Sequence, residues 1–114
     1  MVINGNTEAM IQIRNTTKNE IGEAVENWSD VQLIVGWLDS QGGQANYLTY
    51  NTKLEESSHV FVSDFYELDS RIKAENSRMI INNGAYDIKY IDDPMGLHKQ
   101  LEIFLDYTGG QQYG

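Results

Sequence analysis

At 114 residues the chain can hold one domain with one hydrophobic core, and at this size about two thirds of the unfolded chain's surface can be buried. Seventeen acidic and eight basic residues give a formal charge of −9, which argues against binding to a nucleic-acid backbone because no counterions would be released. The lack of cysteine excludes disulfides and thiolate–metal sites, and no apolar run approaches the ~20 residues that span a bilayer. We therefore expect a soluble, unsecreted protein with no membrane partner.

The chain is expected to begin with a flexible end and a short strand. Residues 1–8 show no apolar periodicity and resemble a frayed terminus. In residues 9–15, Ile11 and Ile13 alternate with polar side chains, which predicts a first strand.

A polar segment follows, and then a strand that is apolar on both faces. Residues 16–30 predict a long connection, with Trp28 near its end as a lid over the adjacent core. Residues 31–39 carry apolar side chains on both faces, as a central strand does, and Gly36 suggests a bend or bulge. We expect this to be the best-buried strand.

Residues 40–57 have no strand pattern and predict one long loop. Thr52 precedes Glu55 with the spacing of a capping box, so the loop has a signal for a short helix. Two interpretations stay open: a disordered surface loop, or an arm that orders on a partner. The residues of the second interpretation are Gln41, Gly42, Gly43, Tyr47, Tyr50 and Lys53.

Strand character resumes in residues 58–66, which are followed by a charged connection. In residues 67–75 only Leu68 and Ile72 are large apolar residues able to tie that connection to the core.

The last third predicts a three-stranded meander. Asn83-Gly84 lies between two apolar alternations, and both central residues of a type I′ turn need positive φ, so residues 78–82 and 85–92 should pair as a hairpin. Residues 100–107 supply a third strand, and residues 108–114 form a flexible end.

About six strands with no long helix predict an all-β fold in a single domain, residues 1–114. A small antiparallel barrel and a sandwich both satisfy this pattern, since each protects the sheet edges.

The chain offers little for catalysis or for metal binding. His59 and His98 are the only histidines, and neither has a partner at the spacing of a metal site or a nucleophile–base pair. Asp92-Asp93-Pro94 lacks the alternating carboxylates and closing Glu of a calcium loop and indicates a turn. Gly42-Gly43 lacks the Gly-Lys-Ser/Thr of a phosphate loop. We expect no catalytic residue, no cofactor and no metal, so the protein should not be an enzyme.

Several motifs occur in a recognisable order along the chain. Upstream these are Ile11-Gln12-Ile13, Gly22-Glu23 before Trp28, a strand with Trp37, and His59-Val60-Phe61-Val62. In the last third they are residues 78–81, Tyr86-Asp87-Ile88, Ile91-Asp92-Asp93-Pro94 and Leu101-Glu102-Ile103.

From Ile11 to Tyr107 this order resembles the head-tail joining proteins of long-tailed bacteriophages, also called head closure or stopper proteins. Two departures stand out: Ser63-Asp64 replaces an Arg-Tyr that is frequent in the family, and residues 67–76 form a slightly longer segment.

The resemblance implies a small β-barrel that forms a homo-oligomeric ring in the virion, beneath the portal. Such a ring joins head to tail, contacts portal and adaptor proteins on one side and tail terminator or completion proteins on the other, and lets DNA pass without specific binding. It would be assembled in the host cytoplasm, and the loop of residues 40–57 would form its gate or its ring contact. The alternatives are a tail-completion or tail-terminator subunit, and an acidic, host-directed binding domain.

Overall fold

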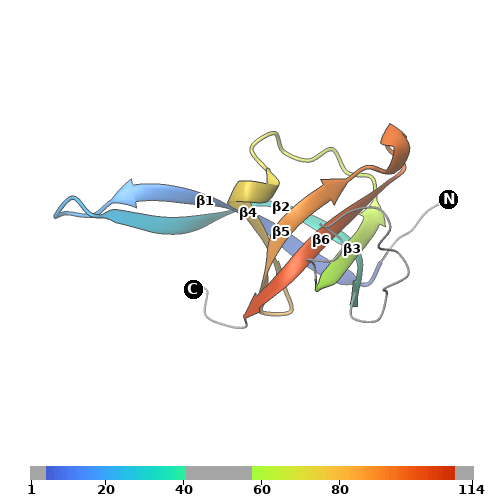
Figure 1. Cartoon of the computed structure of the whole chain (residues 1–114), viewed down its shortest axis with the longest axis horizontal. Helices are drawn as coiled ribbons and strands as arrows, with labels where there is room; N and C mark the ends of the chain where they lie inside the picture. Colours follow the sequence, from blue (N-terminus) through green and yellow to red (C-terminus); the bar gives the residue numbers. More distant parts are fainter. Residues whose placement is uncertain (1–4, 41–57, 110–114) are drawn as a thin grey trace.

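A computed structural model describes residues 5–40 and 58–109, which form one closed antiparallel barrel in the order β1-β2-β3-β6-β5-β4 (Figure 1). The predicted all-β class is therefore confirmed, and of the two architectures left open the barrel is the one formed. Two short 3-10 turns, η2 (Ala74–Asn76) and η3 (Pro94–Gly96), precede β4 and β6. The strands are β1 (Thr7–Lys18), β2 (Ala24–Ser40), β3 (His59–Asp64), β4 (Ser77–Ile81), β5 (Gly84–Asp92) and β6 (Gln100–Gly109).

The core fills the barrel with alternate side chains of the strands, as a strand buried on one face requires. Phe61 on β3 is fully buried, and Ile72 joins the core from the segment before β4. Leu68 packs against the core from the same segment, so the predicted ties of that segment are confirmed. The other large buried residues include Ile11, Ile34, Met79, Ile81, Ile103 and Leu105.

The predicted meander of β4, β5 and β6 is confirmed, but its first turn lies one residue earlier than expected. Ile81 pairs with Gly84, so the two central residues are Asn82 and Asn83, with φ of 51° and 68°. Asparagine tolerates this left-handed region better than most residues, and two such angles are what a type I′ turn needs. Gly84 instead begins β5, where it is buried.

The prediction of a long polar connection over residues 16–30 is wrong. β1 continues to Lys18 and β2 begins at Ala24, and these halves pair with each other beyond the barrel. The resulting hairpin projects to the left in Figure 1, away from the remaining strands. It gives the molecule a long dimension of 51 Å against 26 and 24 Å for the other two. We call residues 14–28 the hairpin arm.

Three expectations about β2 and the chain ends are also corrected. Leu33 and Trp37 are 47% and 46% exposed, so β2 is not the best-buried strand. Gly36 pairs regularly with Thr7, and the shift in the β1–β2 register lies between Ile11 and Gln12 instead. Residues 7, 8, 108 and 109 are expected in flexible ends but belong to strands.

The long loop falls outside the described residues except at its edges. Its predicted short helix and its candidate residues from Gln41 to Lys53 therefore stay predictions. In the part of the chain that the structure covers, no helix has the length and apolar character needed to cross a membrane.

Candidate interaction surface on the hairpin arm and the barrel

The hairpin arm is a two-stranded ribbon without a core of its own. Within residues 14–28, all of which are described, every side chain is exposed or half-buried. Cross-strand polar contacts join its strands: the Asn15 amide donates to the Ser29 hydroxyl at 2.7 Å, and the Asn27 amide donates to the Thr17 hydroxyl at 3.0 Å. Since an isolated two-stranded hairpin is only marginally stable in water, the arm depends on its attachment at the base.

The tip of the arm is organised around Asn19. Its side-chain oxygen accepts hydrogen bonds from the backbone N–H groups of Ile21 at 3.1 Å and Glu23 at 2.9 Å. Its backbone N–H donates to the Glu23 carbonyl, and its own carbonyl accepts from the Gly22 N–H, both at 3.0 Å. Ile21, 77% exposed, is thereby held outward on an ordered turn.

The base of the arm is fixed by two arginines that lie near one indole ring. The guanidinium carbon of Arg78 on β4 lies 4.1 Å from the centre of a Trp28 ring, and that of Arg14 lies 5.9 Å away. Trp28 is not among the described core residues or the side chains packed on them, so it is not the lid that the sequence predicts. It joins the arm to the barrel instead.

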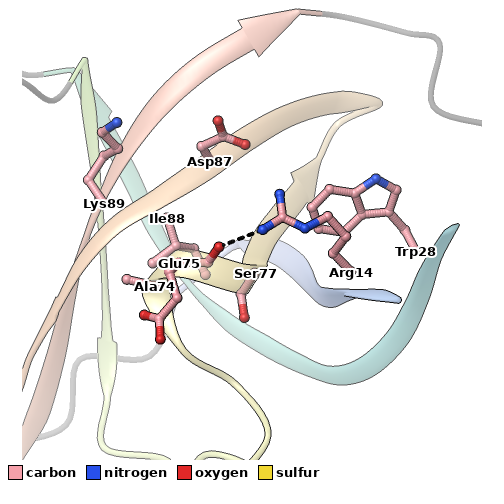
Figure 2. A pocket seen from close by; sticks show the side chains of 8 residues that line it. All are labelled: Arg14, Trp28, Ala74, Glu75, Ser77, Asp87, Ile88 and Lys89. Atoms are coloured by element: carbon pink, nitrogen blue, oxygen red, sulfur yellow. Dashed lines mark hydrogen bonds between the residues drawn. The ribbon is translucent and has the colours of Figure 1, made fainter. Parts of the chain in front are cut away.

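A cleft of about 380 Å³ opens beside this base (Figure 2). Arg14 donates from Nη2 to the Glu75 carbonyl of η2 at 2.9 Å, so one arginine links the arm to the turn before β4. Asp87 and Lys89 of β5 form the far wall. Acidic, basic and indole side chains line the cleft. Each of its charged side chains is exposed or half-buried.

Two side-chain hydrogen bonds, which we call the polar relay, link strands β4, β1 and β2. Arg78 donates from Nε to the Gln12 side-chain oxygen at 2.8 Å, and the Gln12 amide donates to Asp30 Oδ1 at 2.8 Å. The three residues are neighbours on β4, β1 and β2, so the relay runs across the sheet.

Next to the relay lies an apolar row on the outer face of the barrel. Met10 of β1 pairs with Leu33 of β2 on one side and with Ile80 of β4 on the other. These three side chains line a hollow of about 480 Å³ whose rim is largely polar. We call this the β4–β1–β2 hollow. Its rim residues are Asn6, Thr7, Glu8, Asn82 and Asn83.

The opposite outer face, on β5 and β6, is acidic. Asp87 pairs with Asp106, and Asp92 pairs with Glu102, so like charges face each other across the two strands. Directly opposed like charges are destabilising in a sheet. The stacked rings of Tyr90 and Phe104 lie between these pairs, with centroids 5.9 Å apart.

The residues of the sequence motif are mostly core positions. Tyr86, Ile88, Leu101 and Ile103 are buried, and Ile91 packs against the core. Asp92 and Glu102 lie on the outer face, Asp93 is the N-cap of the η3 turn, and Pro94 is its first residue. The predicted turn at Asp92-Asp93-Pro94 is thus confirmed, and the motif specifies the β5–β6 framework.

The two histidines occupy separate structural positions. His59 Nδ1 lies 2.8 Å from the Ser58 hydroxyl, and its ring packs edge-on to Tyr86. His98 stacks on Phe65 with centroids 4.6 Å apart and contacts the Asp93 carboxylate. Across residues 5–40 and 58–109, no group of three His, Asp or Glu side chains is placed to hold a metal ion.

Among the acidic side chains of the described residues, two have a clearly shifted pKa. The hydrogen bonds from the Arg71 guanidinium and backbone lower the pKa of Asp69 to about 2. Burial, followed by the nearby Tyr107, raises the pKa of Tyr86 above its usual value. Neither shift creates an acid–base pair next to a cleft.

The comparisons with known proteins identify a fold and no family. The chain matches no known family and no curated protein. Its structure is similar to the solution structure of protein SF1141 from Shigella flexneri 2a, with a TM-score of 0.67 over 92% of this chain and 94% of that chain. Sequence identity is 17%, so the likeness establishes the shared fold alone.

The arm and the hollow are the features that sequence reasoning missed. The available signal for the arm is weak: β-branched Thr16, Thr17 and Val25 flank a segment with Asn19 and Gly22. No apolar alternation accompanies it, because neither face of the arm covers a core.

Proposed function

We propose that this chain is a structural protein of a long-tailed bacteriophage virion, and that copies of it form a ring at the connector between head and tail. The ring closes the DNA-filled head and joins it to the tail. The observation that carries the proposal is the hairpin arm, which projects from a closed barrel and presents an apolar residue, Ile21, at its tip.

The arm supports assembly because, beyond its base, it covers no part of the core of its own molecule. A polar ribbon that buries none of its side chains adds little to the stability of the barrel, whereas an ordered apolar tip favours burial against another surface. A subunit whose arm reaches a neighbour makes a heterologous contact, and such contacts close into rings.

The acidic surface supports a role for the ring as the wall of a channel for DNA. Like-charge pairs such as Asp87 with Asp106 persist on the outer face of β5 and β6, and the whole chain carries a charge of −9. A wall of this sign repels the phosphate backbone, so DNA would pass along it without being held. The resemblance of the sequence motif to head-tail joining proteins supports the same position, and its apolar members lie in the core of the β5–β6 framework.

Particle composition tests the proposal. In a phage whose gene for this chain is deleted, we expect filled heads that lose DNA and never acquire tails, together with free tails. In tail-less heads from a tail-gene mutant, electron microscopy with antibody to this chain should label the portal vertex.

Each other outcome contradicts the head-side position. Label on head-less tails would assign the chain to the tail as a terminator or completion subunit. A protein absent from both particles, and without affinity for purified portal or adaptor rings, would be an acidic host-directed binding domain.

A further inference from the structure

We propose that the arm tip of one copy seats Ile21 in the β4–β1–β2 hollow of the next copy. The inference rests on the proposed function for closure into a ring, but the pairwise contact can be tested without it. The occupant of the hollow is thus a second copy of this chain, bound head to tail.

The turn that carries Ile21 at the arm tip, which we call the knob, is ordered before it binds. Asn19 holds the backbone N–H groups of Ile21 and Glu23 with one side-chain oxygen, so the turn does not need to be ordered by its partner. A preorganised element loses little conformational entropy on docking, and an aliphatic side chain that is 77% exposed gains most of its burial there.

The centre of the hollow is lined by apolar side chains, which an aliphatic residue such as Ile21 can contact. Leu33 in its lining is 47% exposed, and Met10 and Ile80 extend the apolar row over three strands through direct pairing. The volume of about 480 Å³ exceeds that of a single aliphatic side chain and leaves room for the turn around it.

The rims of the two features also match. Carboxylates of Glu20 and Glu23 flank Ile21 in the sequence, and the rim of the hollow carries three amide side chains against one carboxylate, namely Asn6, Asn82, Asn83 and Glu8. Amide N–H groups donate to carboxylate oxygens, so the polar borders can pair while the apolar centres are buried.

A molecule cannot fill its own hollow. The tip and Leu33 are separated along β2 by nine residue steps from Ala24, or about 30 Å at ~3.3 Å per residue. The arm is hydrogen-bonded over this length and points away from the barrel (Figure 1). Only another copy brings a tip to the hollow, and because knob and hollow are different surfaces the contact repeats from copy to copy.

Engineered cysteines test this contact cleanly, because the chain has no cysteine of its own. A variant with Ile21→Cys and Leu33→Cys should form a ladder of disulfide-linked multimers on mild oxidation of the concentrated protein. A mixture of the two single variants should give the mixed dimer. The matched control carries Ile21→Cys and Tyr90→Cys, which places the second cysteine on the outer face of β5, and should give no ladder.

Three results would overturn the proposal: no ladder from the first pair, an equal ladder from the control pair, or dimers of the Ile21→Cys variant alone. The last would mean a tip-to-tip contact.

A second variant needs no oxidation. Ile21→Asp should weaken self-association by about tenfold or more, with an unchanged circular dichroism spectrum, because a charged tip cannot enter an apolar hollow. Unchanged association would contradict the contact. If the disulfide ladder forms but deletion of the gene leaves head closure and tail joining intact, the contact between copies stands and the phage assignment fails. If the deletion gives the expected defect in head closure but no ladder forms, the phage assignment stands and the contact fails.

Discussion

Arg78 lies over Trp28 with its guanidinium carbon 4.1 Å from the ring centre, and this contact couples β4 of the barrel to the base of the arm. The same arginine donates to Gln12 on β1, so one side chain contacts the arm through a ring and the adjacent barrel strand through an amide. Changing Arg78 to Leu should therefore lower the free energy of unfolding by about 1–2 kcal/mol.

The fluorescence of Trp28, isolated by Trp37→Phe, should also show a more mobile indole in the Arg78→Leu variant. Lys89→Met is the matched control, because Lys89 lines the cleft beside Trp28 and its loss removes the same charge. It should change the free energy of unfolding by less than about 0.5 kcal/mol. Equal effects of the two changes in urea titrations would mean that the ring contact contributes nothing.

Gly36 is required for the close approach of β2 and β3. A Cβ at this position would lie 2.3 Å from the Val62 carbonyl oxygen and 2.8 Å from the Phe61 ring. Because a backbone atom cannot move aside, Gly36→Ala should destabilise the protein by about 3 kcal/mol.

At Gly84 the nearest atom to an added Cβ would be a ring carbon of Tyr107, at 3.1 Å. Gly84→Ala is therefore the comparison variant and should cost about 1 kcal/mol or less. Thermal unfolding of the two variants checks the order, and a Gly36→Ala protein as stable as the wild type would refute the packing argument.

The conformation of the β4–β5 turn predicts opposite effects for two substitutions of one residue. Asn82 has φ of 51°, a region that β-branched residues avoid and glycine accepts. Asn82→Val should destabilise the protein by about 1–2 kcal/mol, whereas Asn82→Gly should be nearly neutral. If valine is tolerated as well as glycine in chemical denaturation, the turn is not the type I′ turn described above.

Tyr86 predicts a loss of stability at alkaline pH. Burial raises the pKa of its hydroxyl in the folded chain above the ordinary value of 10.0, so above that value the folded state holds a proton that the unfolded state has released. The stabilisation is complete below pH 10 and is lost as the pH rises through the folded pKa.

Tyr86→Phe should flatten this decline in the free energy of unfolding, measured by urea titration on both sides of pH 10. The outer-face variant Tyr90→Phe removes one hydroxyl as well and should leave the decline in place. An unchanged pH dependence in the Tyr86→Phe protein would contradict the assignment.

The parts of the fold that the sequence predicts correctly are those in which one face is buried. Tyr86 and Ile88 alternate with polar residues because their face lies in the core, and the resulting period identifies the strand. The predicted turn is one residue too late because Asn82-Asn83 and Asn83-Gly84 both accept positive φ, and only the pairing of Ile81 with Gly84 decides between them.

The candidate surface could not be predicted for the same physical reason. The arm covers no core, so residues 16–30 carry no period and resemble a loop. Leu33 and Trp37 have the pattern of buried residues because an apolar outer face looks the same whether the chain itself or another molecule covers it. The expectation for Trp28 is wrong because a sequence does not show that arginines from two different strands meet at its ring.

The most direct test is sedimentation velocity of the protein with a shortened arm, in which residues 17–25 are replaced by Asn-Gly between the paired residues Thr16 and Glu26. We predict that the barrel keeps its free energy of unfolding within about 1 kcal/mol, because the arm has no core, while concentration-dependent self-association is lost. A shortened protein that associates like the full-length chain, or that no longer folds, would contradict the conclusion that the arm exists to bind another copy.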